Sequence, residues 1–110
     1  MKGPSLRSFP RMSLRNPIEL RAGSRTLRIE KAVGNLSVGG LFVNAGDLPL
    51  NTPVGVKIAA THPFEAEGVV RFCDPEGGGV GIEFTRITDA NRKRLDKLIA
   101  ALTQKEVLAS

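Results

Sequence analysis

The chain has 110 residues, of which 41% are hydrophobic and 25% charged, a composition typical of one soluble globular domain. Its net charge is +5, and no apolar stretch is long enough to cross a bilayer or to act as a secretory signal. The single cysteine, Cys73, and the single histidine, His62, exclude an internal disulfide and a zinc site. We therefore expect one cytoplasmic domain without bound metal.

The basic charge is concentrated in the first quarter of the chain. Residues 1–28 contain seven Lys or Arg against one Glu, whereas the remaining residues contain nine basic and ten acidic side chains. Six of the seven N-terminal cations are Arg, whose planar guanidinium makes paired hydrogen bonds to phosphate and stacks on flat rings. The segment is therefore either a solubilising tail or an arm that captures an anionic, planar ligand.

Alternating apolar and polar residues predict six short strands after a flexible basic arm at residues 1–15. Pro, Gly and Asp separate the strands, a hairpin turn is expected around Gly23, and the pattern breaks over residues 34–40. In the longest strand, the alternation places Phe72 on the same apolar face as Phe64. The predicted strands cover residues 18–22, 27–33, 41–43, 54–58, 64–72 and 80–84.

The period then changes to that of one amphipathic helix, for which Thr88 is the expected N-cap. Four apolar residues recur at helical spacing: Leu95, Leu98, Ile99 and Leu102. Such a helix covers an open end or face of a sheet. The predicted fold class is therefore all-β with a terminal helix. We expect a six-stranded antiparallel β-barrel capped by a C-terminal α-helix over residues 16–104, with a tail at 105–110.

Catalysis is not expected from this sequence. It contains no phosphate-binding glycine loop, no dinucleotide fingerprint and no nucleophile elbow. His62 lies in a turn without a nucleophile pattern nearby, and Cys73 ends a strand as a small packing residue. Glu65 and Glu67 share one strand face, as paired catalytic carboxylates would, but they occupy the polar positions of an alternating strand. A solvated face is the favoured interpretation.

Two short motifs fit together. Residues 7–11 have the spacing R-x-x-x-R in the basic arm, and residues 35–40 match [D/N]-x-S-x-x-G between two strands. Each alone has a structural interpretation. The first is solvated charge, and the second is a polar turn in which Asn and Ser bond the local backbone and Gly39 or Gly40 is left-handed.

In this order, the two motifs resemble those of the PilZ domain family of cyclic di-GMP receptors, and the resemblance covers nearly the whole chain. Residues 68–72 and 79–84 look like two later strands of that domain. The resemblance implies a six-stranded barrel with a final helix, here as a stand-alone domain that binds cyclic di-GMP without a cofactor. The ligand-binding residues that it implies are Arg7, Arg11, Asn35, Ser37 and Gly40, with Arg15 and Gly39 as possible additions.

The resemblance also implies roles for these residues. In the family, the arginines grip phosphates and guanine edges, the polar groups of the second motif read guanine, and its glycine allows close approach. Asn35 stands where many members have Asp, so one carboxylate acceptor is lost. Arg11 and Arg15 form a second R-x-x-x-R, and the working pair is therefore either Arg7 with Arg11 or Arg11 with Arg15. The first pair is favoured because residues 9–14 read like the family's lead into its first strand.

Three functions remain open. The leading one is a cyclic di-GMP receptor that signals through a ligand-induced change in the arm and through contacts with an unidentified downstream protein. The alternative is a PilZ-like adaptor that has lost nucleotide binding and acts only through protein partners. The basic charge also suggests a nucleic-acid binder, but the absence of Trp and Tyr leaves few stacking residues. Neither a nucleic-acid polymer partner nor membrane insertion is expected.

Overall fold

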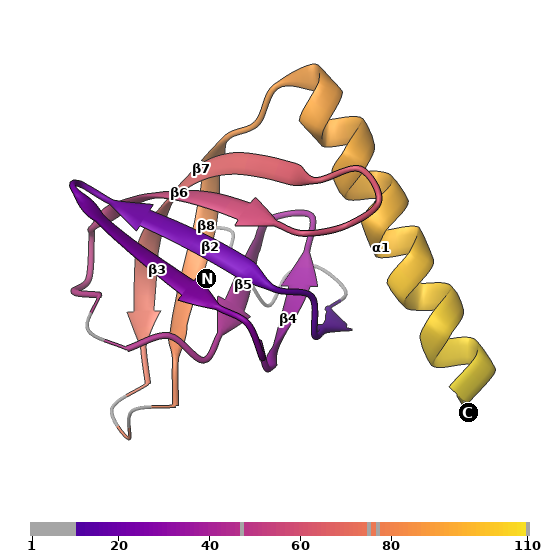
Figure 1. The fold of residues 1–110 in the computed structure, drawn as a ribbon, viewed down its shortest axis with the longest axis horizontal. Coiled ribbons are helices and arrows are strands. Elements are labelled where there is room, and N and C mark those ends of the chain that lie inside the picture. The colour runs from indigo at the N-terminus through magenta and orange to yellow at the C-terminus, as the bar shows by residue number, and fades with distance from the viewer. Residues whose placement is uncertain (1–10, 47, 75, 77, 110) are drawn as a thin grey trace, which may run out of the picture.

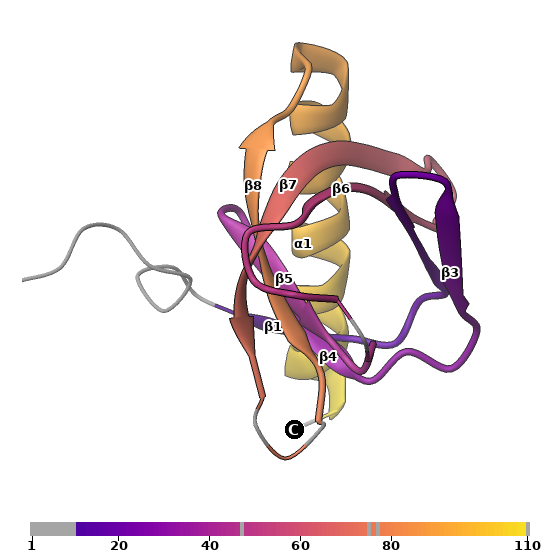
Figure 2. The same ribbon diagram turned by 90° about the vertical axis from the view of Figure 1, so that its left-hand side faces the viewer.

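The computed structural model describes residues 11–46, 48–74, 76 and 78–109, with the side chains of the final helix described to residue 105. In this part of the chain, antiparallel strands form one curled sheet in the order β1-β4-β5-β8-β7-β6-β2-β3, and a helix runs along its side (Figure 1). Figure 2 shows the helix behind the sheet. The elements are β1 (Met12–Leu14), β2 (Ile18–Ala22), β3 (Arg25–Ile29), β4 (Gly34–Ser37), β5 (Gly40–Val43), β6 (Pro53–Ile58), β7 (Phe64–Cys73), β8 (Val80–Arg86) and α1 (Asp89–Ala109).

The predicted count of six strands is wrong, because the described residues form eight. One additional strand, β1, lies within the predicted arm of residues 1–15, and the other, β4, lies where the pattern breaks. β1 alternates over only three residues, too few to be recognised as a strand, and β4 contains a single apolar residue, Leu36. Backbone pairing forms them instead: β1 and β4 pair with each other over a long sequence separation, and β4 also pairs with β5 in a hairpin. The helix also continues beyond residue 104 to Ala109.

Local signals account for the first hairpin and for the start of the helix. Gly23 has φ of 63°, and the pairing of β2 with β3 closes at Ala22 and Arg25, which confirms the predicted turn. Thr88 is confirmed as the N-cap, because its Oγ1 accepts a hydrogen bond of 3.2 Å from the backbone N–H of Asn91. Turn and cap chemistry therefore set these two boundaries.

The core lies between the concave face of the sheet and α1. Leucine side chains of the helix are buried against this face, and α1 packs on β1 and β7. No helix in the described part of the chain is long and apolar enough to span a bilayer. The buried side chains with the least exposure include Leu14, Leu20, Leu36, Leu41, Ile58, Phe64, Val70, Ile82 and Leu95.

Strand β7 departs from regular alternation at two places. Its register against β8 shifts between Glu67 and Gly68 and again between Val70 and Phe72. The second irregularity turns Phe72 outward, so its predicted position on the inner face is wrong and its side chain is 49% exposed. At the first, Gly68 lets the strands approach closely, because a Cβ there would lie 2.6 Å from the backbone oxygen of Glu83.

Replacing Gly68 by Ala therefore tests the close approach of β7 and β8. We expect Gly68→Ala to lower the free energy of unfolding by about 1–3 kcal/mol, because a backbone oxygen cannot move aside as a flexible side chain would. Urea denaturation measures this loss.

The matched control is Gly55→Ala in the neighbouring strand β6, where the new Cβ would have its nearest neighbour 3.5 Å away, on Arg21. We expect a change within about 0.5 kcal/mol in the control. Equal effects of the two substitutions would show that the approach at Gly68 does not limit stability.

Candidate functional site

Arg11 and Asn35 meet at the edge of the sheet formed by β1 and β4. The pairing of these strands places Ser13 opposite Asn35 and Met12 opposite Leu36. Because Arg11 lies two residues before Ser13, its side chain leaves the same face. Its Nε donates a hydrogen bond of 2.6 Å to Oδ1 of Asn35 in a partly buried position. The structure therefore joins one residue from each of the two motifs, although they are 24 positions apart.

The direction of β1 decides which neighbouring arginine can approach the second motif. Because β1 runs antiparallel to β4, Arg11, which directly precedes β1, lies at the Ser37 end of β4. Arg15 follows β1 at the opposite, Gly34 end, and is exposed there. Arg7 lies outside the described residues. The structure thus places Arg11, and not Arg15, beside the second motif, while Arg7 as its companion stays a prediction.

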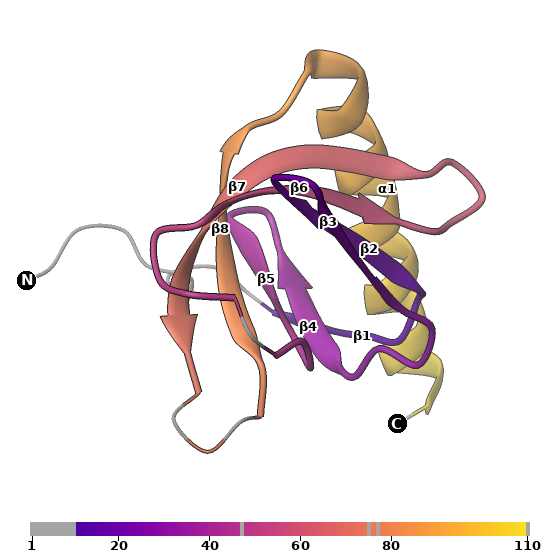
Figure 3. The same ribbon diagram turned by 60° about the vertical axis from the view of Figure 1, so that its left-hand side comes forward.

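Ser37 holds the turn that joins β4 to β5, a hairpin seen in the centre of Figure 3. Its Oγ accepts a hydrogen bond of 3.2 Å from the N–H of Gly39 and donates one of 3.4 Å to the carbonyl of Gly40. Ser37 is fully buried. The expectation that Ser37 bonds the local backbone is confirmed, whereas the Asn35 side chain bonds Arg11 across to β1.

The two turn glycines are not left-handed. Among the described residues, positive φ angles occur at Gly23, Asn51 and Gly79, so the expectation of a left-handed Gly39 or Gly40 is wrong. Gly40 is buried and pairs with Glu83 of β8. Since the next residue in β5 points inward, a side chain at position 40 would project from the outer face of the sheet. Glycine therefore places no side chain on this face opposite Ser37.

The outer face continues from the motif residues onto aromatic side chains that the sequence analysis missed. Asn35 pairs with Phe42, Phe42 pairs with Gly81, and Gly81 pairs with Phe72. The rings of Phe42 and Phe72 lie 6.2 Å apart at an angle of 44°. Phe42 points outward because its neighbours Leu41 and Val43 are buried, but the apolar run Leu-Phe-Val does not show from sequence which residue takes which face. No local signal predicted the outward turn of Phe72.

Glu83, an acidic residue on this face, is electrostatically paired. Glu83 lies opposite Gly40, and its Oε1 accepts a hydrogen bond of 2.8 Å from Nε of Arg71. Both side chains are partly exposed, so the pair adds little stability. It does neutralise the carboxylate that stands nearest to the turn. An anionic ligand on this face would therefore not meet an unpaired negative charge at Glu83.

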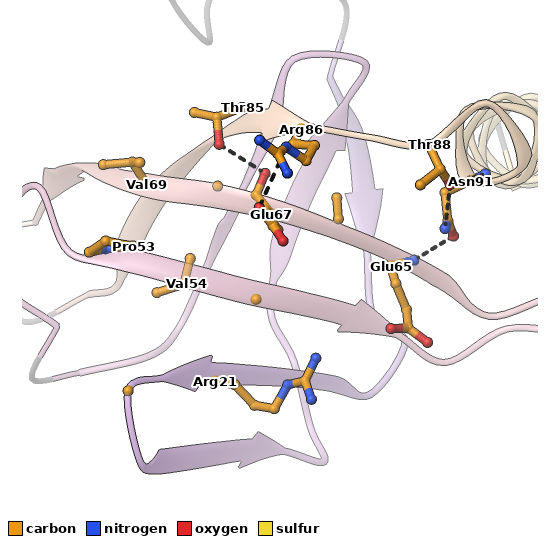
Figure 4. Close-up of a pocket in the computed structure, with 14 residues that line it drawn as sticks. Arg21, Pro53, Val54, Glu65, Glu67, Val69, Thr85, Arg86, Thr88 and Asn91 are labelled. Carbon is orange, nitrogen blue, oxygen red and sulfur yellow. Dashed lines mark hydrogen bonds and ion pairs between the residues drawn. The ribbon is translucent and has the colours of Figure 1, made fainter.

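A separate hollow of about 590 Å³ lies on another part of the sheet's outer surface, between β6, β7 and the start of α1 (Figure 4). Arg21, Glu67 and Arg86 line it, and Nε of Arg86 lies 3.9 Å from Oε1 of Glu67. Glu65 and Glu67 are exposed, as expected for a solvated strand face. None of the predicted site residues that the structure describes lines this hollow. The two surfaces are therefore distinct.

Because Ser37 makes two hydrogen bonds within the turn, we expect its replacement to destabilise the fold even without a ligand. Ser37→Ala should lower the free energy of unfolding by about 1 kcal/mol, because the N–H of Gly39 loses its acceptor. Chemical denaturation measures the difference. The control is Ser24→Ala at the exposed β2–β3 turn, which should change stability by less than about 0.5 kcal/mol. No difference between the variants would mean that the Ser37 hydroxyl does not hold the turn.

Comparisons with known proteins agree with this architecture. The chain aligns with a solved structure entitled "Structure of Bacillus subtilis Inhibitor of motility (MotI/DgrA)" with a TM-score of 0.67 and 18% sequence identity. The alignment covers 100% of this chain and 55% of that one, so the chain spans about half of its length, and the likeness shows the fold alone. No curated protein matched the sequence. The family model of the PilZ domain matches residues 5–101, and the chain therefore belongs to the PilZ domain family.

Proposed function

We propose that this PilZ domain is a receptor for cyclic di-GMP and transmits the binding event to a partner protein. The observation that carries the proposal is the hydrogen bond between Arg11 and Asn35, which joins the two motifs on one face of the sheet. A site with a guanidinium beside an amide and a glycine-containing backbone turn suits a ligand that combines phosphates with flat purines. The domain would act as a binding module without catalysis or cofactor, in the cytoplasm.

The chemistry of the ligand assigns a role to each motif residue. Arg7 and Arg11 would grip phosphate oxygens and guanine edges with their forked donors, and Asn35 would offer amide groups to a base edge. Ser37 acts chiefly by holding the turn, because its hydroxyl is already engaged with the backbone on both sides. Gly40 keeps the approach to the turn free of a side chain. Gly39 stays an additional candidate, whereas Arg15 would contribute only if Arg11 and Arg15 were the working pair.

Strand β1 offers a physical route from this site to the helix. Arg11 and Ser13 belong to its outer face, whereas Leu14 is buried and Met12 packs against the core. The sulfur of Met12 lies 3.2 Å from Oγ1 of Thr103 on α1. The Thr103 hydroxyl donates to the carbonyl of Ile99 at 2.8 Å, so the Met12 contact is one of packing. A ligand that moves Arg11 would therefore also shift the surface on which α1 rests.

An adaptor without nucleotide binding is the alternative function. It is consistent with the Arg11–Asn35 bond and the Ser37 bonds, since these groups satisfy one another in the absence of ligand. Isothermal titration calorimetry with cyclic di-GMP, beside GTP and a short single-stranded oligonucleotide, separates the possibilities. Selective binding of cyclic di-GMP supports the receptor. Heat from none of the three ligands supports the adaptor, and binding of the oligonucleotide contradicts both.

Replacing the guanidinium of Arg11 should weaken cyclic di-GMP binding even when the positive charge is kept. Arg11→Lys keeps the charge but removes the fork and the Nε donor to Asn35, so cyclic di-GMP should bind about ten- to a hundredfold more weakly, roughly 1.5–3 kcal/mol. The control, Arg92→Lys on the exposed side of α1, should bind like the parent. Equal affinity of both variants in calorimetry would mean that Arg11 only contributes to a general positive field.

Two further variants test which arginine binds the ligand together with Arg11. Because Arg15 follows β1 at the Gly34 end of β4, away from Ser37, Arg15→Lys should leave binding within about threefold of the parent, whereas Arg7→Lys should weaken it if Arg7 is the companion. The same calorimetric titration measures both. A large loss in the Arg15 variant with none in the Arg7 variant would show that the working pair is four residues later.

The β1 route predicts that the ligand changes the helix as well as the site. On addition of cyclic di-GMP, amide exchange around Thr103 should change by about fivefold or more, and Met12→Ala should reduce this change while cyclic di-GMP still binds. Hydrogen–deuterium exchange with mass spectrometry measures both states. Identical exchange in α1 with and without bound ligand would contradict transmission through β1.

A further inference from the structure

Among the described residues, packing of the core does not account for the outward position of Phe72. The regular alternation of β7 would bury it, but the irregularity between Val70 and Phe72 turns its ring out of the core. With 49% exposure, it is one of three exposed large hydrophobic residues among those described. The other two, Val33 and Leu50, lie outside the strands. Phe72 alone is presented by the sheet itself.

Phe42 lies beside Phe72, and together they form a surface that we call the aromatic shelf. Gly81 of β8 pairs with both residues and is buried between their strands, so no side chain separates the two rings. The ring centroids are 6.2 Å apart. In the other aromatic pair, by contrast, Phe64 is fully buried. The ring contact at the shelf is therefore partly exposed to solvent, whereas the other aromatic pair packs against the core.

The shelf is continuous with the candidate site. Phe42 pairs directly with Asn35 across β4 and β5, and Asn35 holds the side chain of Arg11. On one sheet face, a flat ligand anchored at Arg11 and Asn35 would thus meet Phe42 on the adjacent strand. Phe72 lies two strands further in the same direction.

We propose that the aromatic shelf of Phe42 and Phe72 is a stacking subsite for a purine base of the bound nucleotide. The inference rests on the proposed function, because it extends the site at Arg11 and Asn35 across the sheet. Charged phosphates would lie at the guanidinium, and a base would cover exposed aromatic carbon on the shelf. Stacking of a base on an aromatic side chain strengthens binding roughly tenfold or more.

The composition of the chain makes the shelf directly measurable. The sequence contains no Trp and no Tyr, so Phe72→Trp introduces one indole at the shelf and keeps a flat ring there. Titration with cyclic di-GMP should quench its fluorescence, with a midpoint that matches calorimetry on the same variant. Leu50→Trp, at an equally exposed position outside the strands, should show no quenching at saturation.

Two truncations separate ring stacking from general apolar contact. Phe72→Ala should weaken cyclic di-GMP binding roughly tenfold, and Phe72→Leu should lose nearly as much because it keeps apolar surface but no ring. Leu50→Ala should bind like the parent. Since Phe72 is half exposed, circular dichroism and thermal unfolding should show that each variant remains folded.

The outcomes distinguish this inference from the proposed function. If the parent binds cyclic di-GMP but Phe72→Ala binds equally well, or the indole is not quenched at calorimetric saturation, the subsite is contradicted and the receptor function stands. If Phe72→Leu retains the parent's affinity, the contact is apolar and base stacking is contradicted. If the parent does not bind cyclic di-GMP, the proposed function fails and the subsite falls with it.

Discussion

Three residue pairs between β1 and β4 determine whether the two motifs form one site. Their register sets Ser13 opposite Asn35 and thereby brings Arg11 to the same face. A slip of one residue would turn Arg11 towards the core, since neighbouring side chains of a strand point to opposite faces. Leu14, which is fully buried, opposes such a slip because it would be moved into solvent. The polar site on the outside of the sheet therefore depends on the apolar anchoring of a short edge strand.

The same strand explains how a small domain can connect a ligand to a partner. Arg11 stands at the outer face, and Met12, the next residue, packs towards Thr103 of α1. A ligand bound at Arg11 would thus contact the face of these few residues opposite to the one on which the helix packs. An edge strand has a neighbouring strand on one side only, so moving it requires less free energy than moving a central strand. This location allows β1 to respond to a ligand without unfolding the core.

Much of the fold is readable from local pattern, because β2, the turn at Gly23 and the cap at Thr88 are each specified by neighbouring residues. β1 and β4 are not, because their long-range pairing with each other stabilises them without a strong local pattern. The candidate site divides in the same way. Motif spacing identified Arg11 and Asn35, but their mutual hydrogen bond depends on the register of two distant strands. The outward turn of Phe72 depends on an irregular register against β8.

The central claim is that a nucleotide binds where β1 meets the β4–β5 turn. Nuclear magnetic resonance of the ¹⁵N-labelled protein during a cyclic di-GMP titration tests it most directly. The account predicts that the largest shifts occur at the side-chain amide of Asn35, the Nε–H of Arg11 and the backbone of Ser37, Gly39 and Gly40. Signals around the hollow of Figure 4 should stay in place. Shifts concentrated at that hollow, or no shifts at saturating ligand, would contradict the account.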